Sequence, residues 1–389
     1  MDNYMGLSPE QASERLLRGV SVIPETESVP IEEALGRVAA EAVNAPFPLP
    51  PFDRSAMDGY ALRAADTLNA AAEKPVALSP DRALPIGTGG ALPEGCDAVA
   101  KRENTEMRGD TVFLRRALQS GENVCFAGED IAQGAPALEP GRLLGRGDLG
   151  VLAALGVNTV TVRRRPRAVL LTTGGELLAP GETPRPGAVY DSLSPMLTAS
   201  LCAAGVQLLR RERCGDDAVG LKTALYRATK DADLVLTTGG VSVGDSDLLP
   251  GVLTETGAEI CFRRARIKPG SPTTAAFLNG VPVLCLPGTP FAAVANFDYY
   301  CYPLLARLLG CSALLPQEAE AAATSDFART SPVLRLLRAK EENGRVFIPA
   351  DQRPSDIAVL ADCNCYVEQT PGQSIRAGDR VNIHRMKVT

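Results

Sequence analysis

The chain has 389 residues, enough for roughly two to three domains at about 150 residues each. Its 45% hydrophobic and 22% charged residues are ordinary for a globular protein and argue against a disordered chain. The net charge is −6, which argues against a general nucleic-acid binder. Because His384 is the single histidine, a metal site built from several histidines is excluded.

The ten cysteines are scattered, and the closest spacing is the CxC of Cys363 and Cys365. This pattern favours buried thiols in a reducing compartment over a disulfide framework. The first residues lack the basic and apolar regions of a signal peptide, and no apolar run reaches the ~18 residues of a membrane span. We therefore expect a cytoplasmic protein.

The first segments of the chain differ in composition and in the structure that they predict. Ser8 is the predicted cap of a helix, with Pro9 in its first turn and Gln11 completing a capping box. Residues 45–55 carry four prolines and predict an extended linker. Short apolar segments between Gly and Pro turns then predict a β-rich domain up to residue 137. Residues 138–165 can return to the N-terminal segment, which favours a discontinuous first domain.

From residue 167 apolar strands alternate with helices. Strands are expected near 168–171, 206–209, 234–236 and 281–286, and helices near 194–201, 217–229, 247–255 and 291–309. Fully apolar strands joined by helices predict a doubly wound parallel α/β domain. The last part of the chain returns to short strands with Gly and Pro turns and predicts a small β-barrel or sandwich.

Three of the predicted strands end in glycine turns, at residues 172–175, 237–240 and 286–289. Ligands of open α/β sheets bind beyond the carboxyl ends of the strands. Glycine lets backbone N–H groups approach an anion closely. The turns therefore predict a phosphate or nucleotide pocket; the alternative is that each glycine ends its strand for steric reasons alone.

Carboxylates follow these turns. Glu176 comes directly after the first turn, Asp245 and Asp247 follow the second, and Asp216 and Asp217 lie between a strand and a helix. Converging oxygen ligands suit Mg²⁺, which bridges phosphate oxygens. The alternative is helix capping, for which Asp217 and Asp247 are both well placed.

A cationic strip lies between the second and third turns. It contains Arg263, Arg264, Arg266 and Lys268, followed by a Pro-Gly turn. In an acidic protein such a strip is a candidate clamp for an anion, with a solvated strand edge as the alternative.

The segment Phe52–Ala61, FDRSAMDGYA, resembles the signature of the molybdopterin molybdenumtransferase family, which includes MoeA and the gephyrin E domain. Further motifs agree in order: LPEGCDAV at 92–99, GEDI at 128–131, TTGGVSVGDSD at 237–247, IKPG at 267–270 and LPGTP at 286–290. The resemblance covers most of residues 6–310 and, more loosely, the C-terminal domain.

This resemblance implies four domains and an elongated homodimer. The domains would be a discontinuous N-terminal α+β domain (1–45 and 138–166), a β-rich domain (46–137), a molybdopterin-binding α/β domain (167–311) and a C-terminal β-barrel domain (312–389). The implied reaction inserts molybdate into adenylylated molybdopterin with Mg²⁺-dependent release of AMP. A molybdopterin adenylyltransferase and molybdoenzyme maturation factors are the implied partners, with no nucleic acid and no membrane.

The resemblance also implies the site residues. The implied catalytic residues are Asp58, Glu176, Asp216, Asp247 and Lys268, of which Glu176, Asp216 and Asp247 would hold the metal. The implied cofactor-binding residues are Thr88, Gly174, Gly239, Gly240, Ser242, Arg264, Lys268, Pro287, Gly288, Arg335 and Ser355.

The sequence departs from the family pattern at several site-lining positions. Gly175 stands where the family has an acidic residue, Ser271 where it has a lysine, and Thr289 where it has an asparagine, while residues 125–127 lack an arginine run. The alternative function is therefore a catalytically degenerate relative that carries the cofactor or scaffolds a partner. A molybdopterin adenylyltransferase is a third hypothesis, opposed by the SAMDGY motif and the C-terminal β domain.

Overall fold

A computed structural model describes residues 5–215, 217–241 and 248–387. The chain divides into two compact units. The sheet-barrel unit consists of Met1–Glu27, Gly36–Val38 and Arg163–Thr389, and the inserted unit of Ser28–Leu35 and Ala39–Val162. Among the described residues, no helix is both long and apolar enough to cross a membrane.

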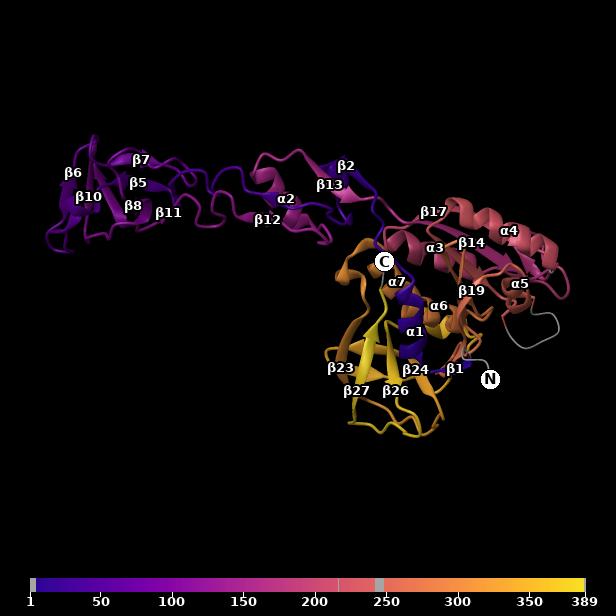
Figure 1. Cartoon of the computed structure of the whole chain (residues 1–389). Helices are drawn as coiled ribbons and strands as arrows, with labels where there is room; N and C mark the ends of the chain where they lie inside the picture. The colour runs from indigo at the N-terminus through magenta and orange to yellow at the C-terminus, as the bar shows by residue number, and fades with distance from the viewer. Residues whose placement is uncertain (1–4, 216, 242–247, 388–389) are drawn as a thin grey trace. The chain divides into compact units, whose positions relative to one another are not determined.

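The centre of the sheet-barrel unit is a large sheet, seven-stranded as far as the described residues go (Figure 1). Its order is β1 (Met5–Leu7), β19 (Glu259–Ala265), β21 (Thr274–Leu278), β22 (Val281–Leu286), β18 (Leu234–Thr238), β14 (Arg167–Thr173) and β17 (Gln207–Cys214). β14 runs parallel to β17 and β18, and β18 runs parallel to β22. β21 runs antiparallel to both β19 and β22, so the predicted parallel sheet is in fact mixed.

Helices cover both faces of this sheet, which confirms the doubly wound α/β class. Alternate residues of a strand point to opposite faces. Val169 and Leu171 of β14 share an apolar cluster with Leu225 of α4 (Ala218–Asp231) and Val252 of α5 (Leu249–Glu255). In addition, α3 (Leu193–Ala203) packs on β17 and on α6 (Pro290–Asn296), and α1 (Pro9–Arg18) packs on β19.

The first described strand joins the large sheet. Ser8 and Gln11 form the predicted capping box of α1. Yet β1 pairs in parallel with β19, and α1 contacts β19 and α7 (Tyr302–Leu309). The segment up to Glu27 thus groups with the sheet-barrel unit, and the predicted domain of residues 1–45 and 138–166 stays a prediction. The other predicted domain boundaries stay predictions.

The expected helix over 291–309 is present with an interruption. A π-helical turn at Phe297–Cys301 separates α6 from α7. α7 ends at Gly310, whose φ of 62° is left-handed and suits glycine at a helix C-terminus.

The C-terminal residues form the predicted β-barrel, drawn in orange and yellow in Figure 1. In the described chain, five strands close on themselves in the order β24, β25, β23, β27 and β26, with β26 returning to β24. Their bounds are Gln317–Ala323 (β23), Leu334–Glu342 (β24), Arg345–Phe347 (β25), Cys365–Gln369 (β26) and Arg380–Arg385 (β27), and α8 spans Ile357–Ala361. Leu337, Val346 and Ile383 lie in the barrel core. β20 (Ile267–Lys268) extends the barrel sheet by pairing with β24.

The inserted unit is built from short strands and has two apolar clusters. One contains Leu62, Ala98 and Leu114, and the other contains Leu138 and Leu152. Its strands include β3 (Val43–Asn44), β4 (Arg54–Ser55), β5 (Gly59–Leu62), β6 (Val76–Leu78), β7 (Leu84–Ile86), β8 (Ala98–Lys101), β9 (Thr105–Arg108), β10 (Thr111–Leu114), β11 (Val124–Cys125) and β12 (Pro136–Leu138). Its helix is α2 (Arg146–Ala154). β2 (Thr26–Pro30) and β13 (Thr159–Arg163) pair where the chain leaves and re-enters the sheet-barrel unit.

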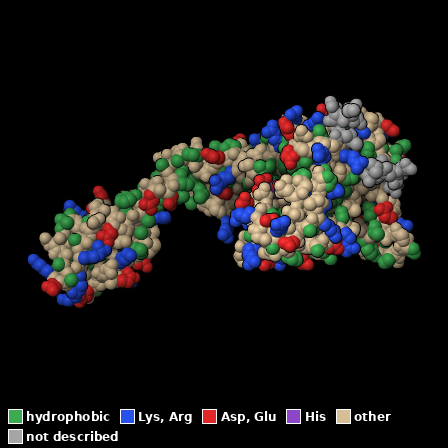
Figure 2. Space-filling model, turned by 90° about the horizontal axis from the view of Figure 1, so that it is seen from below, with side chains coloured by type: hydrophobic (Ala, Val, Ile, Leu, Met, Phe, Trp, Pro, Cys, Tyr) green, Lys and Arg blue, Asp and Glu red, His purple; other side chains and the backbone are tan. Residues whose placement is uncertain are grey.

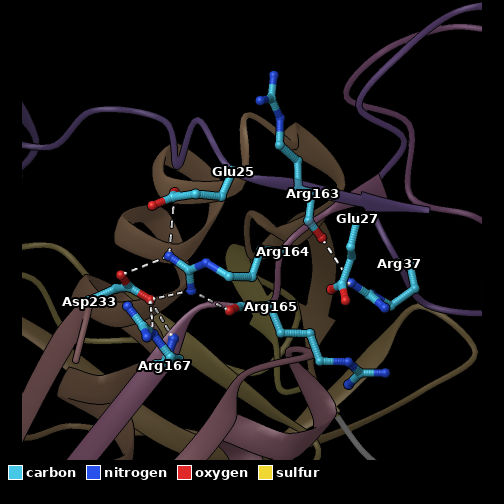
Figure 3. Close-up of polar contacts among 8 residues, drawn as sticks. All are labelled: Glu25, Glu27, Arg37, Arg163, Arg164, Arg165, Arg167 and Asp233. Atoms are coloured by element: carbon cyan, nitrogen blue, oxygen red, sulfur yellow. Dashed lines mark hydrogen bonds and ion pairs between the residues drawn. The ribbon is translucent and has the colours of Figure 1, made fainter. Parts of the chain in front are cut away.

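An ion-pair cluster anchors the returning chain within the sheet-barrel unit (Figure 3). Arg164 donates from its two terminal nitrogens to the carboxylate of Asp233, at 2.8 and 3.0 Å, and also pairs with Glu25 at 3.5 Å. The backbone N–H of Arg167 donates to the same carboxylate at 2.7 Å. Burial alone would raise the pKa of Asp233, but these hydrogen bonds outweigh it and hold that pKa below its ordinary value.

Candidate functional site

The three glycine turns lie at one edge of the large sheet. They follow β14, β18 and β22, which are parallel neighbours, so their carboxyl ends meet. The Thr173 hydroxyl donates to the carbonyl oxygen of Thr238 at 3.0 Å, and the Gly239 N–H donates to that of Leu286 at 3.1 Å. Gly239 has a φ of +80°, and a Cβ there would lie 2.8 Å from the Thr173 hydroxyl oxygen. Glycine is therefore required for the turns to approach one another.

Two adjoining pockets open at this edge. The cationic pocket, of about 620 Å³, is lined by Lys268, Arg329 and Arg335. The acidic pocket, of about 670 Å³, is lined by Glu176 and Asp191. The two pockets share a floor made of Gly239, Gly240, Gly288 and Thr289. The structure thus places opposite charges on either side of the glycine turns.

The cationic pocket is made by a pairing between distant segments. β20 runs parallel to β24, and in this register Lys268 lies opposite Arg335. Like charges directly opposite each other in a sheet repel. Burial, and secondly the nearby Arg329, lower the pKa of Arg335. An anion bound among the three cations relieves both the repulsion and the desolvation, so the pocket is suited to an oxyanion.

The turn after Lys268 is held from below. The side-chain amide of Asn296, fully buried on α6, donates to the carbonyl oxygens of Pro269 at 2.9 Å and Ala292 at 2.8 Å. Gly270 has a φ of +94°, and a Cβ on it would lie 1.8 Å from the Asn296 amide nitrogen. This contact fixes the turn that presents Lys268.

The acidic pocket has Glu176 at its rim. The Glu176 carboxylate packs over Gly174, whose missing side chain leaves room for it: a Cβ there would lie 2.8 Å from the carboxylate. The carbonyl oxygen of Glu176 accepts a hydrogen bond from the N–H of Val189 at 3.0 Å. Asp191 accepts from the N–H of Ser194 at 2.9 Å and so caps the start of α3.

A loop from the barrel lines both pockets and is anchored by a buried arginine. Arg338 is fully buried, lies over the Phe291 ring with 4.5 Å to its centroid, and donates to the carbonyl oxygens of Asp351 and Arg353, each at 3.2 Å. The loop brings Gln352 and Pro354 to the cationic pocket and Ser355 to the acidic one. An arginine between apolar neighbours in the run LRLLRA was the available signal, and Arg329 was missed as well.

The predicted site residues divide into groups. Lys268, Pro287 and Arg335 line the cationic pocket, Gly174, Glu176 and Ser355 line the acidic pocket, and Gly239, Gly240 and Gly288 line both. Asp216, Ser242 and Asp247 lie outside the described residues. Asp217 caps α4 by accepting from the Gly220 N–H at 2.8 Å, as its capping interpretation predicts.

The predicted cationic clamp is not one surface. Arg264 and Arg266 are absent from the described linings of both pockets, and Arg263 donates to the Thr254 hydroxyl at 2.6 Å, on α5. Arg263 and Arg264 are neighbours on β19, so their side chains face opposite sides of the strand, and Arg264 has a φ of 60°, which turns the chain before β20. Lys268 is the member of the strip that reaches a pocket.

Asp58 and Thr88 lie together in the inserted unit. Asp58 accepts from the Thr88 N–H at 2.6 Å and from the Thr88 hydroxyl at 2.8 Å. Both bonds lower the pKa of Asp58 below its ordinary value, and the bond from the backbone N–H has the larger effect. Asp58 is therefore an anion across the neutral range.

The departures from the family pattern have local roles. The Ser271 hydroxyl donates to the carbonyl oxygen of Ala265 at 2.9 Å and so closes the turn after β20. The Gly175 carbonyl oxygen accepts from Arg185 at 3.1 Å. Thr289 is the N-cap residue of α6 without a side-chain capping bond. Ala127 donates through its N–H to the Asp53 carboxylate at 2.8 Å.

The described residues contain no group of three or more His, Cys, Asp or Glu side chains placed to hold a metal ion. Of the predicted ligands, Glu176 alone falls in the described part of the chain.

On the face shown in Figure 2, cationic and acidic side chains are interspersed, in line with an anion site that is local rather than spread over a basic surface.

Comparisons with known proteins agree over nearly the whole chain. Residues 7–156 match the family model described as the MoeA N-terminal region (domain I and II), and residues 169–307 match that of a probable molybdopterin binding domain. The chain is 31% identical over 398 residues to the molybdopterin molybdenumtransferase of Staphylococcus epidermidis, covering 97% of this chain and 95% of that protein. It is 34% identical over 367 residues to that of Bacillus subtilis, covering 88% of this chain and 85% of that protein.

A solved structure shows the same fold. The molybdopterin biosynthesis protein MoeA of Pyrococcus horikoshii superposes with a TM-score of 0.85 at 27% identity, covering 98% of this chain and all of that one. Sequence identity and fold therefore lead to one conclusion: the chain belongs to the molybdopterin molybdenumtransferase (MoeA) family, transferases of molybdenum cofactor biosynthesis.

Proposed function

We propose that this chain inserts molybdate into adenylylated molybdopterin. Molybdate condenses with the two dithiolene thiols, so that two Mo–S bonds form and one molybdate oxygen leaves as water. A water molecule adds to the phosphoanhydride, and AMP leaves. The observation that carries the proposal is the pair of adjoining pockets, one cationic and one acidic, on a shared glycine floor in a member of this family. Such a division suits a substrate whose oxyanions are neutralised by cations and whose phosphoanhydride is cleaved beside a metal ion held by carboxylates.

The cationic pocket is assigned to the oxyanions. Lys268 and Arg335 lie opposite each other, and Arg329 lines the same pocket. Burying an anion without compensation is very costly, so these cations neutralise molybdate or the phosphate that it approaches. Backbone N–H groups of the glycine turns add donors that need no reorganisation during the reaction.

The acidic pocket is assigned to the metal-assisted cleavage. Mg²⁺, when bound, supplies charge that polarises the phosphate oxygens. Glu176 suits this hard cation because its carboxylate is exposed at the pocket rim. Asp216 and Asp247 complete the proposed ligand set. The proposal also assigns Asp58, held as an anion by Thr88, a part in the reaction.

The proposal includes a cytoplasmic homodimer. A member of this family that works as a dimer should sediment at twice the mass of the chain, which is 40.9 kDa. Sedimentation equilibrium of the purified chain tests this, and a monomer across the accessible concentration range would contradict it.

The enzymatic proposal is tested by AMP release from adenylylated molybdopterin, with molybdate and Mg²⁺ each present or omitted. Wild type should need both. Lys268→Ala should lose at least about 100-fold in rate, the scale measured for a group that stabilises developing charge. Glu176→Gln should shift the Mg²⁺ requirement to higher concentration.

Matched controls come from the same unit. Lys230→Ala, in the last turn of α4, and Glu255→Gln, at the end of α5, change the same residue types at positions that line neither pocket. Both should keep wild-type rates. Tight binding of the adenylylated substrate without any AMP release would instead support a carrier.

A further inference from the structure

One wall of the acidic pocket is formed by side chains that have no role in the assignments above. β16 (Val189–Tyr190) pairs in parallel with β15 (Leu177–Leu178) beside the first glycine turn. Val189 is 55% exposed and Tyr190 is 45% exposed, and both line the pocket. Tyr190 is the one aromatic residue in the described lining of this pocket.

The Tyr190 ring is held in place. Its hydroxyl donates to the carbonyl oxygen of Glu182 at 2.8 Å. On either side of it, the N–H groups of Val189 and Asp191 donate to the carbonyl oxygens of Glu176 and Leu178, at 3.0 and 2.8 Å. An exposed ring that is already fixed loses little conformational freedom when a ligand stacks on it. This wall is therefore preorganised for a flat ligand.

Charge decides which part of the substrate lies there. The cations are in the other pocket, and the described lining of the acidic pocket contains neither lysine nor arginine. Apart from a phosphate held through Mg²⁺ at Glu176, anions are repelled from the Tyr190 wall by Glu176 and Asp191. An uncharged planar ring is not excluded, and the exposed apolar surface of Val189 and Tyr190 favours it.

We propose that Tyr190 is the stacking wall for the adenine of the adenylylated substrate, with the AMP phosphate lying over the shared glycine floor. Asp191 and Ser192 follow Tyr190 directly and line the same pocket, which places acceptor oxygens near the amino edge of the base. This inference rests on the proposed function and deepens it, because it assigns the nucleoside to the acidic pocket and makes Tyr190 a specificity residue.

The test measures binding by calorimetry with two probes, AMP and ribose 5-phosphate, which lacks the base. Wild type should bind AMP more tightly than ribose 5-phosphate. Tyr190→Ala should weaken AMP binding by about tenfold or more, the scale of base stacking on an aromatic side chain, and leave ribose 5-phosphate unchanged. Tyr190→Phe keeps the ring but loses the hydroxyl bond to Glu182, so it should bind AMP more tightly than Tyr190→Ala and slightly less tightly than wild type.

The matched control is Phe347→Ala, which removes an exposed aromatic ring from β25 on the barrel. It should not change AMP binding. Neopterin serves as a third probe, because a pterin is also a planar nitrogen heterocycle. If Tyr190→Ala weakens neopterin but not AMP, the assignment of the base is wrong.

Three results separate this inference from the proposed function. Wild type that binds AMP better than ribose 5-phosphate, with the same preference in Tyr190→Ala, overturns the stacking wall and leaves the transferase proposal intact. Wild type that binds AMP no better than ribose 5-phosphate overturns the base site. Wild type that binds neither probe contradicts the adenylate chemistry itself.

Discussion

Asp58 accepts two hydrogen bonds from Thr88, one from the backbone N–H at 2.6 Å and one from the hydroxyl at 2.8 Å, although 30 positions separate them in the chain. Both bonds favour the ionised carboxylate, so the pKa of Asp58 lies below its ordinary value of 3.8. A carboxylate in this state cannot serve as a general acid near neutral pH. Its available roles are those of an anion: an acceptor, a metal ligand or a base.

Thr88→Val removes the hydroxyl and keeps the backbone N–H. The pKa of Asp58 should rise toward its ordinary value and remain below that of an unbonded carboxyl, because the stronger backbone bond persists. Carboxyl carbon NMR titration measures this directly. Asp81, whose pKa is lowered by the Ser79 side chain, is an internal reference that should not move. An unchanged Asp58 titration would show that the hydroxyl bond is absent in solution.

Asn296→Ala tests the support under the Lys268 turn. The Pro269 carbonyl oxygen loses its buried donor, and an unsatisfied buried group costs about 1–3 kcal/mol of unfolding free energy. Activity should fall together with affinity for molybdate. Chemical denaturation and steady-state kinetics check the two effects. Asn382→Ala, at an exposed position on β27, should change stability by less than about 0.5 kcal/mol.

Gly270→Ala tests the same contact from the other side. A Cβ there meets the Asn296 amide nitrogen at 1.8 Å, and the φ of +94° strains any side chain. The double variant with Asn296→Ala should therefore be less destabilised than the sum of the single variants, because the steric part of the penalty disappears. Additive losses would mean that the clash does not occur.

Asp298 predicts a pH dependence of stability. The Tyr366 hydroxyl donates to its carboxylate at 2.7 Å, but burial dominates and raises the pKa of Asp298 from 3.8 to about 7. The folded state then holds a proton that the unfolded state has released. The stabilisation is complete below pH 3.8 and is lost as the pH rises to about 7.

Asp298→Asn should remove this decline. Unfolding free energies of wild type and the variant, measured by urea denaturation across that interval, should differ progressively with pH. Asp110→Asn, an exposed change, should leave the wild-type slope unchanged. Parallel curves for wild type and Asp298→Asn would show that the Asp298 carboxyl titrates normally.

The Arg164–Asp233 pair predicts a pH dependence of stability opposite in sign to that of Asp298. The pKa of Asp233 is lowered in the fold, so its stabilisation is present above the ordinary value of 3.8 and is lost as the pH falls below it. Arg164→Ala should cost about 2 kcal/mol or more at neutral pH, because it leaves a half-buried carboxylate poorly paired. Arg18→Ala, which breaks the exposed pair with Glu14, should cost less than about 1 kcal/mol. Equal losses would contradict the anchoring role.

Local signals in the sequence were enough to predict several elements of the fold. Ser8 and Gln11 define the start of α1 because a capping box lies within four residues. The glycine turns after β14, β18 and β22 meet because parallel strands place their carboxyl ends together. Apolar runs do not encode strand direction, and the antiparallel β21 therefore escaped prediction.

The rest depends on contacts between distant segments. Lys268 faces Arg335 because β20 joins the barrel sheet, and no local pattern records that pairing. Arg264 carries the same charge as Lys268 but does not line either described pocket, because Arg264 lies on β19 of the large sheet and Lys268 on β20, beside the barrel strand β24. β1 spans Met5–Leu7, too short a strand to show a period, so its pairing with β19 has no local signal in the sequence.

The most direct test of the account is the ratio of AMP released to molybdenum recovered on the dithiolene product, measured with wild type in the presence and absence of molybdate. The account predicts one AMP for each molybdenum, no release without molybdate, and loss of both products in Lys268→Ala but not in Lys230→Ala. AMP released at the same rate without molybdate, or a product that carries no molybdenum, would contradict it.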